Sequence, residues 1–142
     1  MKNIPFYFIV VFWGEEHRGH LLDLCLPALL SDGNIPSLND KANSRFVICT
    51  TAPDWAALQE HPTFHLMKRY IDPVFIDMPH PSKQDNKMLV MSAGHRLAST
   101  MAFQDKACGV FLTPDLVLSD GSVKELQRLA IEGRKVVLCS AV

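Results

Sequence analysis

A carboxylate directly follows a proline at the end of an apolar run, in the segment Thr113-Pro114-Asp115. Pro114 has no amide hydrogen to donate to a sheet, so we expect a strand to end there and Asp115 to lie at its carboxyl end. Carboxylate oxygens are hard ligands that suit Mg²⁺ or Mn²⁺ bridging the phosphates of a diphosphate. Asp115 is therefore a candidate metal ligand, and an ordinary turn aspartate is the competing interpretation.

Trp13 and Gly14 follow the first apolar run of the chain. The indole of Trp13 can stack on a nucleotide base, although a packed core tryptophan explains this residue equally well. Neither a Gly-x-Gly-x-x-Gly nor a Gly-Lys-Ser/Thr pattern follows the run. The dinucleotide-binding and P-loop mechanisms, in which backbone amides crowd around a phosphate, therefore have no support in the sequence.

Side chains elsewhere offer weaker signals for anion or metal binding. Arg96 lies beside the apolar stripe of a predicted helix, where it can reach a phosphate or simply face solvent. His17 and His20, and likewise His61 and His65, have spacings that occur in metal sites. No further ligands accompany either pair, so the sequence disfavours a zinc site.

Five apolar runs define the strands that position these residues, and they cover residues 6–12, 46–50, 74–78, 109–113 and 135–141. The runs are continuous rather than alternating, which is typical of strands covered on both faces in a parallel sheet. Helical patterns lie between them. The sequence therefore predicts an α/β fold, a three-layer sandwich around a mainly parallel, doubly wound sheet of about five strands.

The longest predicted helix covers residues 86–106 and has two rows of apolar side chains. Leu89 and Leu97 belong to one row, and the smaller Gly94 and Ala98 belong to the other. Small residues let a helix approach a sheet closely. We expect both rows to pack on the sheet.

Two further helices have capping signals at their starts. Thr51 is placed to cap a helix that has Pro53 in its first turn. Ser122 and Glu125 have the spacing of a capping box, in which each side chain binds an otherwise unpaired amide. The chain therefore alternates between strands and helices along its whole length.

In a doubly wound sheet, ligands bind outside the carboxyl ends of the strands, where the strand order reverses. This rule directs attention to residues 13–17, 50–54, 77–87 and 113–115 and to the end of the chain. Trp13 and Asp115, the two residues with the clearest chemistry, both belong to these segments.

The composition narrows the functional classes. The 142 residues are 48% apolar, which suits a single α/β domain over residues 1–142. A net charge of -1 argues against a nucleic-acid partner, because domains that neutralise phosphates are usually basic. The apolar run before Gly14 is too short to span a membrane, and no cleavage site follows it. We therefore expect a cytoplasmic protein without membrane insertion.

The cysteines are Cys25, Cys49, Cys108 and Cys139, and no two of them form a Cys-x-x-Cys pair. Three of them lie in or beside apolar runs. We expect buried, reduced thiols rather than a zinc site or a disulfide framework.

Together these segments resemble the nucleotide-binding half of a glycosyltransferase with the GT-A fold. The resemblance rests on their order along the chain and spans most of it. The segments are the opening strand with Trp13-Gly14, Leu26-Pro27-Ala28-Leu29-Leu30, Gly33-Asn34-Ile35-Pro36, Cys49-Thr50-Thr51, the long helix ending at Ala102, Phe111-Leu112-Thr113-Pro114-Asp115 and Ser119-Asp120-Gly121-Ser122.

In that family an Asp-x-Asp motif after a strand holds a divalent metal on the diphosphate of a nucleotide sugar. The corresponding triplet here looks like Thr113-Pro114-Asp115, so the resemblance implies a metal-binding role for Asp115 alone, with Mn²⁺ or Mg²⁺. It also implies nucleotide contacts near Trp13, Thr50 and Thr51, and Arg96 is a further nucleotide-binding candidate. The implied partner is a nucleotide-sugar donor.

The acceptor-binding and catalytic part of such an enzyme normally follows the strand that residues 135–141 resemble. We therefore expect the chain to be the N-terminal part of a longer protein. We also expect it to bind a donor but not to transfer sugar alone, because transfer needs a bound acceptor and usually a base.

Two other functions stay open. Asp77 ends a strand-like run that looks like the phosphoacceptor strand of a response-regulator receiver, with Glu15 and Glu16 as its acidic pair. The lysine-proline turn that usually follows the fifth strand of a receiver is missing. A non-catalytic α/β interaction domain would also explain why strong motifs are absent.

Overall fold

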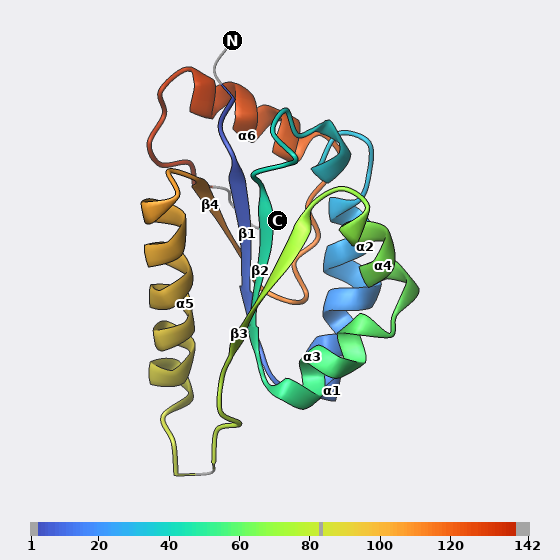
Figure 1. Ribbon diagram of the computed structural model, residues 1–142, viewed down its shortest axis with the longest axis vertical. Helices are drawn as coiled ribbons and strands as arrows, with labels where there is room; N and C mark the ends of the chain where they lie inside the picture. The colour runs from blue at the N-terminus through green and yellow to red at the C-terminus, as the bar shows by residue number, and fades with distance from the viewer. Residues whose placement is uncertain (1–2, 83, 139–142) are drawn as a thin grey trace.

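The computed structural model describes residues 3–82 and 84–138, which form a sheet with helices on both of its faces (Figure 1). The strands are β1 (Phe6–Val11), β2 (Arg45–Thr50), β3 (Asp72–Asp77) and β4 (Cys108–Leu112). The α-helices are α1 (Glu15–His20), α2 (Leu26–Leu29), α3 (Ala52–Gln59), α4 (Pro62–Lys68), α5 (Lys87–Gln104) and α6 (Ser122–Ile131). Two shorter segments lie among them, the π-helix η1 (Leu21–Cys25) and the 3₁₀-helix η2 (Ile35–Ser37). The predicted α/β fold is confirmed.

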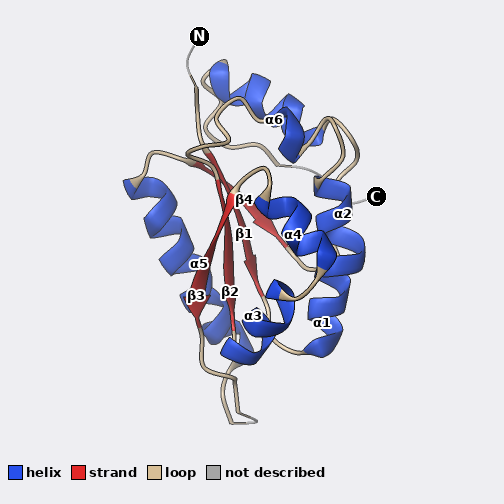
Figure 2. Cartoon of the chain, turned by 45° about the vertical axis from the view of Figure 1, so that its right-hand side comes forward, coloured by secondary structure: helices blue, strands red, loops and turns tan. Residues whose placement is uncertain are grey.

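The described sheet has four strands in the order β3-β2-β1-β4, and every pair is parallel. The chain adds β2 and β3 on one side of β1 and then places β4 on the other side, so the strand order reverses between β1 and β4. Helix α5 lies on one face of the sheet, and α1 to α4 lie on the other (Figures 1 and 2). This arrangement follows from right-handed crossovers, which place the helices before and after the reversal on opposite faces.

The prediction of about five strands is wrong for the part of the chain that the structure describes. Residues 135–138 begin the fifth apolar run but form no strand, and residues 139–141 lie outside the described residues. Val136 and Leu138 are 77% and 91% exposed. The physical reason is the position of α6, which packs against η2 and lies across the end of the sheet where the strands begin (Figure 1). The chain therefore leaves α6 without being laid along β4.

Strand β1 is buried along its whole length and serves both cores of the molecule. Phe8 and Val10 pack in the larger core beneath η1, α2 to α4 and α6, and Ile9 and Val11 pack in the smaller core beneath α5. Successive side chains of a strand point to opposite faces, so a strand covered on both sides needs apolar residues at every position. The continuous apolar run is explained by this burial.

Helix α5 packs on the sheet through only one of its two predicted rows. Gly94 and Ala98 of the small row are buried, as expected. Leu89 and Leu97 are 68% and 55% exposed, so the prediction that the leucine row also packs on the sheet is wrong.

Close approach between α5 and the sheet explains which row is buried. A Cβ atom built on Gly94 would lie 2.9 Å from Sδ of Met78 and 3.1 Å from the methyl groups of Val11. A spacing this tight selects glycine and alanine at the contact. The larger leucines consequently occupy the outer flank of the helix.

The predicted capping box does not start α6. The residue before this helix is Gly121, whose φ of +93° suits glycine, and no side chain caps the helix from that position. Glu125 forms an ion pair with Arg128 instead of turning back to the Ser122 amide.

A buried asparagine from the loop after α2 replaces the capping box. The amide of Val123 donates to Oδ1 of Asn34 at 2.9 Å, and the amide of Lys124 donates to the carbonyl of Gly33 at 3.1 Å. Asn34 is fully buried and also donates to the carbonyls of Ala28 and Ser119. Tertiary contacts therefore satisfy the free amides that every helix start leaves open.

The described cysteines are free, with Cys25 and Cys49 buried and Cys108 half-buried, while Cys139 lies outside the described residues. Burial raises the pKa of the Cys25 thiol to about 12, helped by the negative charge of Asp115, and burial raises that of Cys49 to about 11. Within residues 3–82 and 84–138, no helix has the length and apolar character to cross a membrane.

Candidate functional site

The carboxyl ends of β1 and β2 lie side by side at the edge of the sheet where α1 and α3 begin (Figure 2). Thr51 follows β2 and caps α3, because its Oγ1 accepts a hydrogen bond from the amide of Asp54 at 3.3 Å. Pro53 lies in the first turn of α3, so the cap predicted from the sequence is confirmed.

A buried carboxylate joins these two strand ends. Asp54 is 4% exposed, and its Oδ2 accepts from the amide of Gly14 at 2.9 Å and from Oγ1 of Thr51 at 2.6 Å. Its Oδ1 accepts from Nη1 of Arg18 at 2.6 Å. The turn after β1 and the turn after β2 are thereby tied to one side chain.

The charge of Asp54 is stabilised by this network. Burial raises its pKa, but the bonds from Thr51, Gly14 and Arg18, together with the positive charge of Arg18, outweigh burial and hold the pKa below its usual value. Asp54 is therefore ionised at neutral pH.

Thr50 supplies an unsatisfied hydroxyl beside this network. It ends β2 and is fully buried, and its Oγ1 has no hydrogen-bond partner among the described residues. Phe46 and Ile48 share its side of the strand and belong to the core beneath α1 to α4. The Thr50 side chain therefore lies on the face of the sheet that the layer with Arg18 covers. A buried hydroxyl without a partner is costly.

Trp13 is half-buried between the end of β1 and Gly14. Gly14 has a φ of +99°, a left-handed conformation that favours glycine and turns the chain from the strand into α1. Trp13, Thr50 and Thr51 are thus brought to adjacent strand ends. Stacking of Trp13 on a base stays a prediction.

Asp115 lies at the strand-order reversal. Leu112, the last residue of β4, pairs with Val10 of β1, and the chain then turns through Thr113 and Pro114 to the exposed Asp115. The negative charge of the Asp115 carboxylate helps to raise the pKa of Cys25 in η1. It borders a cavity of about 880 Å³ that runs along β4 to α6 and residues 134–138.

Arg96 is not brought together with the other candidates. It is exposed on α5, and α5 covers the opposite face of the sheet from α1 and α3 (Figure 1). Its assignment to a nucleotide site stays a prediction without support from the arrangement of these helices.

Whether Asp115 can hold a divalent metal depends on the phosphate oxygens that a bound nucleotide adds to the coordination. In the part of the chain that is described, no group of three or more histidine, cysteine, aspartate or glutamate side chains is placed to hold an ion. Asp115 is a single exposed carboxylate. Mg²⁺ is commonly held by one or two carboxylates together with substrate phosphates, so Asp115 fits a metal that arrives on a diphosphate.

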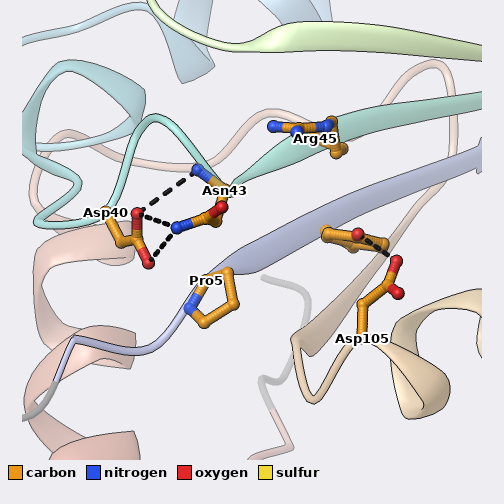
Figure 3. Close-up of a pocket in the computed structure, with 6 residues that line it drawn as sticks. Pro5, Asp40, Asn43, Arg45 and Asp105 are labelled. Carbon is orange, nitrogen blue, oxygen red and sulfur yellow. Dashed lines mark hydrogen bonds between the residues drawn. The ribbon is translucent and has the colours of Figure 1, made fainter.

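A second, smaller cavity lies at the opposite edge of the sheet, where the strands begin (Figure 3). It has a volume of about 460 Å³ and is lined by Pro5, Tyr7, Asp40, Asn43, Arg45 and Asp105. The buried Tyr7 hydroxyl donates a hydrogen bond to Asp105. Burial is the larger cause and this hydrogen bond the second cause of a Tyr7 pKa that is raised to about 12. Asp40 already binds Asn43, so both carboxylates are engaged within the protein.

Sequence reasoning missed Asp54 and Arg18, which carry the best-defined polar network of the carboxyl edge. The spacing Thr51-x-x-Asp54 at a helix start was a usable signal, because a carboxylate in the first turn can turn back to the cap. Arg18 had no signal, since its pairing with Asp54 depends on how α1 packs beside α3.

These features define the chain as a doubly wound, parallel α/β domain with a polar edge at the carboxyl ends of its strands. Comparisons with family models, with curated proteins and with solved structures found no match.

Proposed function

We propose that the carboxyl edge of the sheet binds the nucleoside diphosphate part of a nucleotide sugar, as the donor-binding portion of a glycosyltransferase. The observation that carries the proposal is the position of Asp115 at the reversal between β1 and β4, where doubly wound sheets bind ligands. The adjoining cavity of about 880 Å³ has the volume of a small-ligand site and is lined by Asp115, but not by Trp13, Thr50 or Thr51.

Each candidate has a role in the proposed site. Asp115 would hold Mn²⁺ or Mg²⁺ against the diphosphate, and the metal would neutralise the phosphate charge when bound. Trp13 offers a half-buried indole for the base. Thr50 and Thr51 lie at the neighbouring strand end, and the Thr50 hydroxyl has no hydrogen-bond partner among the described residues.

The strand order disfavours the alternative that this chain is a receiver-like signalling domain. Receivers have the order 2-1-3-4-5, which places the ends of the first and third strands side by side. Here β2 lies between β1 and β3, so Asp77 at the end of β3 is separated from Glu15 and Glu16 after β1. An interaction domain without catalysis remains the second candidate, favoured by the exposed side chains of Leu97 and Phe111.

Asp115→Asn is expected to weaken the binding of UDP or GDP in the presence of Mn²⁺ by roughly tenfold, about 1.4 kcal/mol, without changing the melting temperature. The amide keeps the size of the side chain but loses the charge that holds the metal. Calorimetric titration with and without Mn²⁺ measures the effect.

Asp72→Asn is the matched control, since Asp72 is an exposed aspartate at the start of β3, at the other edge of the sheet. We expect Mn²⁺ to strengthen binding to the parent and to this control but not to Asp115→Asn. Equal dependence on Mn²⁺ in all three proteins would make Asp115 an ordinary turn residue.

A further inference from the structure

We infer that Arg18 is the residue that contacts the diphosphate of the ligand, and that Asp54 is the positioning residue that holds its guanidinium at the edge of the sheet. This inference rests on the proposed function and assigns to it a phosphate-binding group that no sequence motif indicated. It concerns the buried network between α1 and α3 rather than Asp115.

The geometry of Arg18 supports this role. Only Nη1 of its guanidinium is used within the described residues, in the 2.6 Å bond to Asp54. The side chain of Arg18 is 23% exposed, while that of Asp54 is 6% exposed. The buried carboxylate therefore fixes one side of the guanidinium and leaves its other N–H donors at the surface, where they can bind a second, anionic partner.

The unsatisfied Thr50 hydroxyl is the second observation. It is buried at the end of β2, adjacent in the chain to Thr51, which itself donates to Asp54. Among the described residues this hydroxyl has no partner, and a phosphate oxygen that displaces the atoms covering it would supply an acceptor. An arginine held by a carboxylate and a hydroxyl without a partner thus lie at the same strand ends.

The surrounding charges define which form of diphosphate fits. Glu15 and Glu16 are exposed in the first turn of α1, close in sequence to Arg18. They would repel a bare diphosphate, which carries several negative charges. A diphosphate neutralised by a divalent cation avoids most of this repulsion, so we expect the metal complex of UDP or GDP to bind better than the free nucleotide.

The test distinguishes two roles of Arg18, which are contact with the phosphates of the ligand and neutralisation of the Asp54 charge. Arg18→Gln removes the charge but leaves Asp54 buried without its cation, so it is expected to lower both stability and binding. The double variant Arg18→Gln with Asp54→Asn removes both charges and is expected to recover the parent's melting temperature. Its affinity for UDP or GDP with Mg²⁺ is nevertheless expected to stay at least about tenfold weaker.

Two comparisons complete the experiment. Arg18→Lys keeps a positive charge and is expected to restore part of the affinity, and Arg45→Gln at the opposite edge is expected to change nothing. Uridine and guanosine, which have no phosphates, should bind the double variant and the parent equally. Inorganic pyrophosphate with Mg²⁺ should compete with UDP on the parent and lose this ability in the double variant.

Each outcome decides the question. Binding of UDP or GDP by the double variant at the parent's affinity would show that Arg18 only neutralises Asp54, and the inference would fail while the proposed function stands. Equal weakening of nucleoside and nucleotide binding would also overturn it, because the lost contact would not involve phosphate. A parent protein that binds neither nucleotide would refute the proposed function and this inference with it.

Discussion

Ala98→Asp is expected to destabilise the domain severely, whereas Leu97→Asp, one position earlier, leaves its stability nearly unchanged. Ala98 is fully buried between α5 and the sheet, and the smaller core around it is apolar. A carboxylate there has no cation to pair with, and an uncompensated buried charge costs about 3–5 kcal/mol. Since a small domain has about 5–15 kcal/mol of stability in total, this loss removes a large part of it and lowers the urea midpoint well below that of the parent.

Leu97 is 55% exposed, so the same substitution at this position places the carboxylate in water. We expect a loss of about 1 kcal/mol or less. Urea unfolding followed by circular dichroism measures both variants under identical conditions. Equal midpoints for the two variants, or a more damaging Leu97→Asp, would show that the described face of α5 is wrong.

Asn34→Leu is the second substitution with a large expected effect. The leucine has a similar size but cannot replace the bonds that Asn34 makes to Val123, Ala28 and Ser119. The Val123 amide would lose its acceptor, whereas the carbonyls of Ala28 and Ser119 keep their bonds from Ser31 and Ser122. We expect a cost of roughly 1–3 kcal/mol in the free energy of unfolding. Hydrogen exchange should also show faster opening at the start of α6, because the Val123 amide loses its acceptor.

Asn39→Leu is the matched control for this prediction. Asn39 is exposed in the same connection between α2 and β2, and only its backbone amide is bonded, to Oε1 of Gln127. The control should unfold at nearly the parent's urea concentration. A loss as large as that of Asn34→Leu would assign the effect to added apolar surface in the loop rather than to the buried amide.

Much of the fold could be predicted because local chemistry and tertiary burial agree. The continuous apolar run of β1 reflects two-sided burial, and the cap of α3 by Thr51 depends on neighbours only three residues away. The boundaries of α5 follow in the same way from Asn86 at its start. Local patterns of this kind predict the structure correctly because the contacts behind them join residues that are close in the sequence.

Features that depend on distant contacts could not be predicted. Ser122 and Glu125 have the local spacing of a capping box, but the acceptor for the Val123 amide is Asn34, which lies 89 residues away in the sequence. The two rows of α5 look alike in sequence, and only the 2.9 Å approach at Gly94 decides which one is buried. The fifth run forms no strand in residues 135–138, because an apolar pattern does not determine where α6 directs the chain.

The residues of the candidate site also differ in whether local sequence patterns or distant contacts determine their positions. Residues that directly follow strands, such as Trp13, Thr51 and Asp115, could be placed from the strand pattern alone. The ion pair between Arg18 and Asp54 joins residues 36 apart, and it exists because α1 and α3 pack side by side. Arg96 shows the converse, since a favourable position on a helix did not reveal which face of the sheet that helix covers.

The central claim is that the carboxyl edge of the sheet binds a nucleoside diphosphate. The most direct test is a titration of the ¹⁵N-labelled protein with UDP and GDP in the presence of Mg²⁺, followed by amide chemical shifts. We predict that the amides of residues 13–18, 50–52, 54, 113, 115 and 116 shift together at a common affinity, while the amides of Tyr7, Asn43 and Arg45 at the opposite cavity stay unchanged (Figure 3). Shifts confined to that opposite cavity, or no shifts at millimolar nucleotide, would contradict the claim.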